Sequence, residues 1–114
     1  MKLDPRNHGE VLMIEVNEPR IDAAVAIQFK DTLRDLAANG PDRVVLDMKA
    51  VDFLDSSGLG AVVAAMKQLG ASRKLELAAL TPTVEKVFRL TRMDTVFRIH
   101  ADAQSALGGL AKAS

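Results

Sequence analysis

The segment Asp55-Ser56-Ser57-Gly58 holds the side chains of this chain that are best placed to take part in chemistry. Two adjacent hydroxyls lie between a carboxylate and a glycine, after a strand-like segment and before a helical one. Backbone N–H groups at the start of a helix lack partners and can hold an anion. A serine there serves either as the cap of the helix, which stabilises it by about 1 kcal/mol, or as the acceptor of a phosphate.

Two details of this segment favour more than helix capping. One serine suffices for a cap, and Gly58 and Gly60 are poor residues for a first turn unless a backbone or a ligand approaches closely. A phosphate here adds about −1.5 to −2 charges, and the positive end of the helix dipole stabilises negative charge at this position. Phosphorylation would therefore leave the domain folded and would change the binding of a docked partner. Asp55 would strengthen the repulsion of an acidic partner. The residues alone leave both interpretations open, with Ser56 as the expected cap if only one of the hydroxyls serves as a cap.

The spacing of the same segment does not match the common catalytic motifs. A hydrolase elbow needs a glycine two residues before its serine, where this chain has Leu54 or Asp55. The dinucleotide fingerprint lacks its last glycine because Val63 stands there, and no Gly-Lys pair exists for a P-loop. We therefore expect no catalysis, while nucleotide binding at the Gly58 helix start stays a third interpretation.

Metal binding has little support in the sequence. Asp47, Asp52 and Asp55 lie near one another in the chain, but no histidine or cysteine accompanies them. We expect solvated strand-end or capping carboxylates, with a weak magnesium site left open. His8 and His100 are expected to be ordinary surface or boundary residues. The sequence thus predicts neither a metal nor a cofactor.

Composition sets the broad class. At 114 residues, with 48% hydrophobic and 26% charged side chains, the chain suits one globular domain, which we expect to span 1–114. Fifteen basic residues balance fifteen acidic ones, and tyrosine and tryptophan are absent, which argues against nucleic-acid binding. The absence of cysteine favours a reducing compartment, so the cytoplasm is the expected location. No signal-peptide core is present, and the apolar run 58–66 is far shorter than the ~20 residues that span a bilayer.

Hydrophobic periodicity predicts an alternation of strands and helices around these residues. The weakest segment is an edge strand at 2–3, followed by a turn at 7–9. The remaining expected strands cover 11–16, 43–48, 74–80 and 95–99, and the expected helices cover 24–38, 57–69, 82–91 and 101–112. The order predicts an α/β fold whose mixed central sheet is opened by an N-terminal hairpin and packed with about four helices.

Several residues predict where these elements end. The nearly continuous apolar run 43–48 is typical of a central strand covered on both faces. Asn39-Gly40-Pro41 is expected to end the first helix by left-handed capping, and Gly70 to end the second. Thr81 before Pro82 predicts a capped start for the third.

These residues resemble the bacterial anti-anti-sigma factors, small proteins of the STAS superfamily. The specific part of the resemblance is the run Asp55-Ser56-Ser57-Gly58-Leu59-Gly60 at a strand-to-helix junction, and the similarity in element order covers nearly the whole chain. Moderate support comes from Val44-Val45-Leu46-Asp47, from Val51 and Phe53, and from Ile21-Asp22-Ala23-Ala24 ahead of a helix that contains Phe29.

The resemblance implies a switch by phosphorylation. Ser57 would be the phosphoacceptor, modified by an anti-sigma factor that is also a serine kinase and restored by a PP2C-type phosphatase. The unmodified form would bind the kinase and the phosphorylated form would release it. Asp55, Ser56 and Gly58 would shape the docking surface, and Asp22 would lie near Ser57 and share it. Taken alone, Asp22 is equally well explained as a residue at the start of a helix.

Two positions depart from the family pattern. Arg20 and Lys49 add positive charge near the expected docking surface, so the identity of the partner is left open. Relatives in the superfamily also control secretion, flagellar or stress pathways without contacting a sigma factor. The alternative function is an unphosphorylated STAS module that serves as a structural subunit of a transporter or a sensory scaffold.

Overall fold

The fold is a mixed β-sheet with helices on both faces, as the sequence predicted. The structure is a computed structural model that describes residues 1–112. Its main sheet has the order β1-β2-β4-β6-β7, with β1 antiparallel to β2 and the other pairs parallel. These strands are β1 (Leu3–His8), β2 (Val11–Val16), β4 (Arg43–Asp47), β6 (Lys74–Ala78) and β7 (Ile99–His100). A second small sheet pairs β3 (Arg20–Ile21) with β5 (Phe53–Leu54), and the helices are α1 (Ala26–Ala37), α2 (Ser56–Leu69), α3 (Pro82–Leu90) and α4 (Ala103–Lys112).

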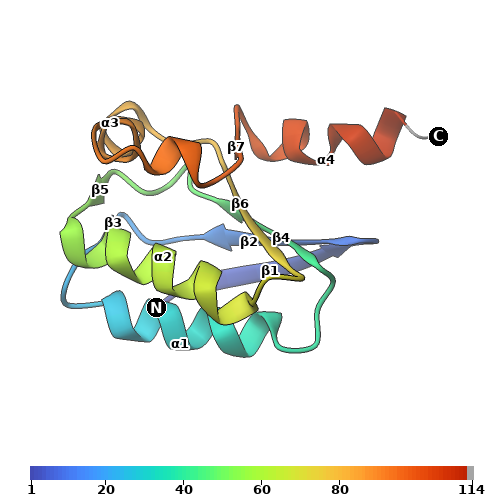
Figure 1. Cartoon of the computed structure of the whole chain (residues 1–114), viewed down its shortest axis with the longest axis horizontal. Helices are drawn as coiled ribbons and strands as arrows, with labels where there is room; N and C mark the ends of the chain where they lie inside the picture. The colour runs from blue at the N-terminus through green and yellow to red at the C-terminus, as the bar shows by residue number, and fades with distance from the viewer. Residues whose placement is uncertain (113–114) are drawn as a thin grey trace.

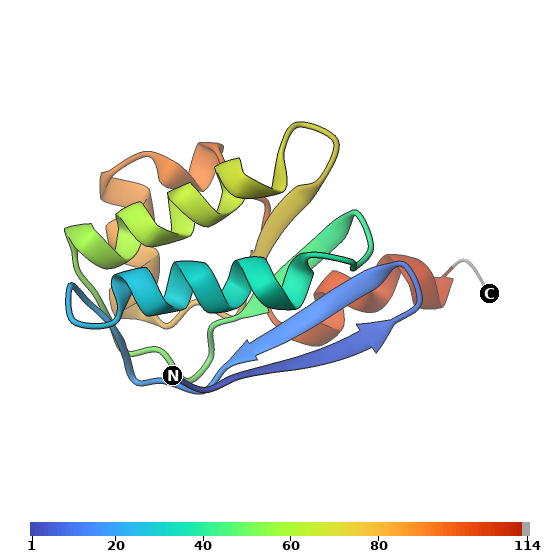
Figure 2. The same ribbon diagram turned by 90° about the horizontal axis from the view of Figure 1, so that it is seen from below.

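Strand β4 lies at the centre of the main sheet and is buried on both faces. Val44 and Leu46 belong to the large core, whereas Val45 belongs to a smaller core on the other face that includes Ala106 of α4. Helices α1 and α2 lie side by side over the first face and α4 covers the second (Figures 1 and 2). The continuous apolar run of this strand therefore predicted its position correctly.

The N-terminal hairpin is longer than the sequence predicted. Strand β1 continues through His8, and its pairing with Val11 leaves Gly9 and Glu10 as the connecting turn. Gly9 has a φ of 64°, a left-handed conformation that glycine adopts without strain. Pro5 does not interrupt the strand because β1 is at the edge of the sheet, where its missing N–H is not needed.

The prediction of a strand at 95–99 is wrong. A 3₁₀ helix, η1 (Met93–Thr95), precedes a strand of only two residues, Ile99–His100. Phe97 turns into the core instead and packs edge-on against Phe88, with ring centroids 5.9 Å apart. Burial of this aromatic ring therefore outweighs strand pairing over most of the segment.

Helix ends agree with the sequence in part. Gly70 ends α2 with a φ of 85°, as expected, and Pro82 is in the first turn of α3. The left-handed cap expected at Asn39 and Gly40 is wrong, because neither has a positive φ; the Gly40 N–H bonds to the Ala37 carbonyl instead. Thr81 precedes α3 but does not cap it, since its hydroxyl donates to the Val51 carbonyl at 2.8 Å.

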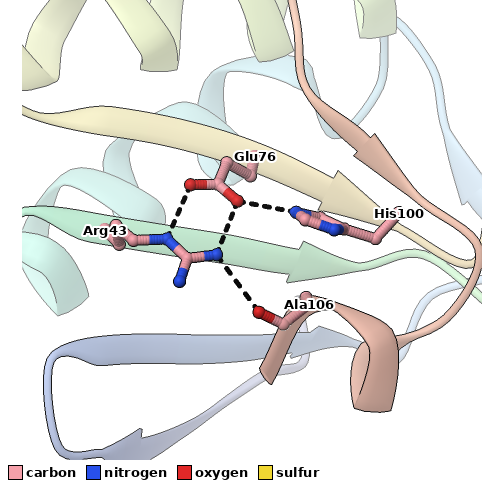
Figure 3. A network of polar contacts seen from close by, with 4 residues as sticks. All are labelled: Arg43, Glu76, His100 and Ala106. Atoms are coloured by element: carbon pink, nitrogen blue, oxygen red, sulfur yellow. Dashed lines mark hydrogen bonds and ion pairs between the residues drawn. The ribbon is translucent and has the colours of Figure 1, made fainter. Parts of the chain in front are cut away.

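A buried ionic network links α4 and the edge strand β7 to the central strands β4 and β6 (Figure 3). Glu76, only 3% exposed, accepts hydrogen bonds from Arg43 Nε at 2.8 Å and Arg43 Nη2 at 2.7 Å. His100 Nε2 lies 2.7 Å from the same carboxylate, and Arg43 Nη2 also donates to the Ala106 carbonyl at 3.2 Å. His8 is exposed and His100 is half-buried at the end of β7, so the expectation of surface or boundary residues is confirmed for both, but His100 also belongs to this network.

The network makes stability sensitive to acid. Burial is the strongest single influence and raises the pKa of Glu76, but the hydrogen bonds and charges of Arg43 and His100 together lower it below its usual value. Since the folded pKa is below the unfolded one of about 4.3, this carboxylate stabilises the fold fully above about pH 4.3. The contribution is lost as the pH falls through the folded pKa.

Glu76→Gln should lower the free energy of unfolding by about 1–3 kcal/mol at pH 7, because Arg43 loses a charged partner. Urea unfolding should also show a shallower loss of stability below about pH 4.3 than in the unaltered protein. Glu85→Gln is the matched control, since Glu85 forms only an exposed ion pair with Arg89. Equal effects of the two substitutions at pH 7, with equal acid slopes, would contradict this role of Glu76.

Candidate functional site

Helix α2 begins at Ser56, and its cap is Asp55. The Asp55 backbone is extended, and its Oδ1 accepts the N–H of Gly58 at 2.8 Å. The expectation that Ser56 is the cap is therefore wrong, because Ser56 already has a position within the first turn. Both Ser56 and Ser57 are exposed. Capping by a carboxylate leaves the two hydroxyls available for another role.

Asp55 also holds the start of α2 against the segment before α1. Its second oxygen, Oδ2, accepts the N–H of Ala23 at 3.2 Å. Asp22, the preceding residue, accepts the N–H of Ala24 at 3.1 Å and pairs with Arg20 Nε at 3.4 Å. The structure thus brings the segment 22–24 to the start of α2, and it gives Asp22 a local structural role as well.

Asp55→Ala should cost about 1–2 kcal/mol in the free energy of unfolding, because it removes the cap and the bond to Ala23. The neighbouring carboxylate Asp52 is exposed, so Asp52→Ala is the control and should change stability by less than about 0.5 kcal/mol. Chemical denaturation of both variants checks the prediction. Equal destabilisation would show that Asp55 does not act as a cap.

Gly58 is explained by a close backbone approach. A Cβ atom at this position would lie 1.9 Å from the Ile21 carbonyl oxygen, so strand β3 leaves no room for a side chain. The expectation that a backbone comes close to the glycine pair is confirmed at this residue. Gly60 differs, because it is exposed and a Cβ atom there would meet nothing within 4 Å. Packing within the described fold therefore requires glycine at 58 but not at 60.

A shallow groove of about 190 Å³ runs beside Ser57 between α1 and α2. Its other lining residues are Ala26, Ile27, Lys30, Gly60, Ala61 and Ala64. Ile27 is 72% exposed, although it is a large apolar residue. Neither Ile27 nor Lys30 was predicted from the sequence to be a site residue. The buried face of α1 consists of Phe29, Leu33 and Ala37. An apolar side chain outside that face was the one feature of the sequence that could have indicated Ile27 as a contact residue.

A second exposed apolar side chain lies close to the Asp22 segment. Phe53 of β5 is 38% exposed, and the guanidinium of Arg20 lies 4.6 Å from the centre of its ring. Arg20 therefore places positive charge beside Asp22, as the sequence indicated. Lys49 instead forms ion pairs within the main sheet, because its Nζ lies 3.6 Å from both Glu15 and Asp47.

The three aspartates considered for metal binding have different surroundings. Asp47 is 3% exposed and accepts the Lys49 N–H at 3.1 Å, so the expectation of a solvated carboxylate is wrong for this residue. Asp55 caps α2 and Asp52 is exposed. Within residues 1–112, no three side chains of metal-ligating type come together. None of the helices that the structure describes has the length and hydropathy needed to cross a bilayer.

Comparison with known protein families shows to which family this chain belongs. The sequence model of the STAS domain matches residues 2–106. The chain belongs to the STAS domain family. Among relatives of this STAS domain, the anti-sigma-F factor antagonist RsfB of Mycobacterium tuberculosis is 27% identical over 104 residues, which cover 91% of this chain and 84% of RsfB.

Solved structures agree with this assignment. An anti-sigma factor antagonist from Mycobacterium paratuberculosis superposes with a TM-score of 0.83 at 26% identity, covering 95% of this STAS domain and 92% of that chain. The phosphorylated form of the Bacillus cell fate determinant SpoIIAA has a TM-score of 0.69 at 20% identity, over 96% of this chain and 99% of its own. The second comparison supports the fold alone.

Proposed function

We propose that this STAS domain is an anti-sigma factor antagonist whose binding is switched off by phosphorylation of Ser57. The observation that carries the proposal is the exposed hydroxyl of Ser57 in the first turn of α2, where Asp55 already supplies the cap. The names of RsfB and of the mycobacterial structure support the antagonist function. SpoIIAA, which has the same fold, exists in a phosphorylated form.

The start of α2 suits a reversible negative charge. The first intrahelical bond runs from the Leu59 N–H to the Asp55 carbonyl, and the Asp55 side chain takes the Gly58 N–H. The N–H groups of Ser56 and Ser57 come before the first helical bond, and the helix dipole favours an anion beside them. A phosphate on Ser57 would therefore leave the domain folded.

The docking surface of this proposal consists of Ser57 and the groove residues Ile27 and Gly60, with Asp22 and Asp55 at its border. Exposed apolar area at Ile27 supplies attraction in the unmodified state. Phosphorylation would add charge and bulk beside two carboxylates and repel a partner that presents acidic groups. Ser56 would lie in the contact, whereas buried Gly58 would act through the packing of α2 on Ile21.

The partners of the proposal are an anti-sigma factor with serine-kinase activity and a PP2C-type phosphatase, both in the cytoplasm. Residues 1–114 would act as one domain that binds and is modified but performs no catalysis itself. No cofactor, nucleic acid or membrane insertion has a part in this proposal.

Phosphosite mapping tests the modification. The protein is incubated with ATP and the anti-sigma factor kinase recovered on the unmodified protein, and intact mass and fragment spectra are recorded. We expect one phosphate on Ser57, its loss in Ser57→Ala and its retention in Ser56→Ala. Labelling that survives Ser57→Ala would overturn the assignment.

A further inference from the structure

A groove of about 780 Å³ lies at the amino-terminal ends of β4 and β6, and it shares no residue with the surface around Ser57. Its volume is in the range of small-molecule sites. Arg43 and His100, which belong to the buried network of Figure 3, are among its lining residues. Arg73 and Lys74 come from the start of β6, and Arg98 comes from the segment before β7.

Positive charge predominates in this groove. Its two acidic residues are Asp42 and Glu76, and Glu76 is already bonded to both Arg43 and His100. Within residues 1–112, the side chains of Arg73, Lys74 and Arg98 form no ion pair. Three cations that face only one further carboxylate, that of Asp42, leave the groove with a net positive charge, which favours an anionic ligand.

Arg73 adds an independent observation. Its Nη2 donates to the Pro41 carbonyl at 2.8 Å, but its buried Nε has no hydrogen-bond partner among the residues that the structure describes. Buried polar atoms in proteins are nearly always bonded, so this guanidinium donor of a groove-lining residue needs an acceptor, either a water or a ligand oxygen. Arginine pairs readily with phosphate oxygens through parallel N–H bonds.

The groove also has apolar lining. Met66 of α2, Leu75 of β6, Val96 and Ala106 of α4 contribute to it, and Val96 is 48% exposed. We propose that this groove binds a small phosphorylated molecule that carries an apolar portion. The phosphate would bond to Arg73, Lys74 and Arg98, and the apolar portion would cover Val96.

A simpler role for the cations must be separated from this proposal. Strand β7 pairs with β6 only at Leu77 and Ala78, so Lys74 lies on an open edge of the sheet. Charged residues on such edges prevent pairing with other chains. Edge protection requires neither a concavity with apolar lining nor an unsatisfied Arg73 Nε, and both observations favour a ligand.

Amide NMR titration of the full chain at constant ionic strength tests the proposal, with inorganic phosphate and phenyl phosphate as probes. We expect saturable shifts confined to 42–43, 66, 72–76 and 96–106, with tighter binding of phenyl phosphate. Arg98→Gln and Lys74→Gln should each weaken it by about 3- to 10-fold. Lys86→Gln, which removes an exposed cation from α3, should have no effect, and Ser57→Ala should bind normally.

Linear, unsaturable shifts spread over all basic residues would overturn the proposal. Equal weakening in Lys86→Gln and Arg98→Gln would do the same. If Lys74→Gln and Arg98→Gln increase self-association and leave phenyl phosphate binding unchanged, the cations protect the sheet edge and the ligand site is refuted.

Discussion

Replacing Gly58 by alanine should destabilise the protein by about 3 kcal/mol or more, because the new Cβ atom would lie 1.9 Å from the Ile21 carbonyl oxygen. The atom that it meets belongs to the backbone of β3, so no side-chain rotation can relieve the contact. Strand β3 pairs with β5, which leads into α2. Moving Ile21 away would therefore disturb the start of the helix that carries Ser57.

Gly60→Ala is the matched control for Gly58→Ala. It makes the same chemical change in the same helix, but the new methyl group has no atom within 4 Å apart from its chain neighbours and the nearby backbone of its own helix. Stability should stay constant or rise by up to about 1 kcal/mol, since alanine has the higher helix propensity. Urea unfolding of the two variants checks both expectations. Similar stabilities of the two would contradict the close packing of α2 on Ile21.

Ser57→Asp should weaken binding to the anti-sigma factor by about 10- to 100-fold, because it places a permanent negative charge in the proposed contact. The fold should be unaffected, since acidic residues in the first turn of a helix interact favourably with its dipole. Isothermal titration calorimetry measures the affinity, and circular dichroism checks the fold.

Ser56→Asp separates position from charge. It adds the same charge to the same helical turn, one residue away, and we expect a smaller loss of affinity than for Ser57→Asp. A partner that binds Ser57→Asp as tightly as the unaltered protein would favour the alternative function, a STAS module that acts as a structural subunit.

Prediction from sequence succeeded where local pattern and tertiary packing agree. The run 43–48 is apolar at successive positions because β4 is covered on both faces, and a short run of this kind is typical of such a strand. The segment 95–99 looks equally strand-like, but burial of Phe97 against Phe88 depends on a residue outside that segment. Local propensity contains no information about that contact.

In the candidate site, too, some features were predicted correctly from the local sequence and others were not. The unusual pair of serines and the glycine after them were visible in the sequence, and the close approach expected at Gly58 is present. The cap was assigned to the wrong residue because Asp55 and Ser56 are both good capping residues, and only the helix boundary distinguishes them. Ile27 became visible once the fold showed which face of α1 is buried.

The measurement that tests the central claim most directly compares the unmodified protein with the protein phosphorylated on Ser57 by its kinase. Calorimetric titration of each form into the anti-sigma factor gives the two affinities, and treatment with a PP2C-type phosphatase returns the second form to the first. We predict that the unmodified form binds, that the phosphorylated form binds at least about tenfold more weakly, and that phosphatase restores the affinity. Equal affinities of the two forms, with phosphate verified on Ser57, would contradict the switch.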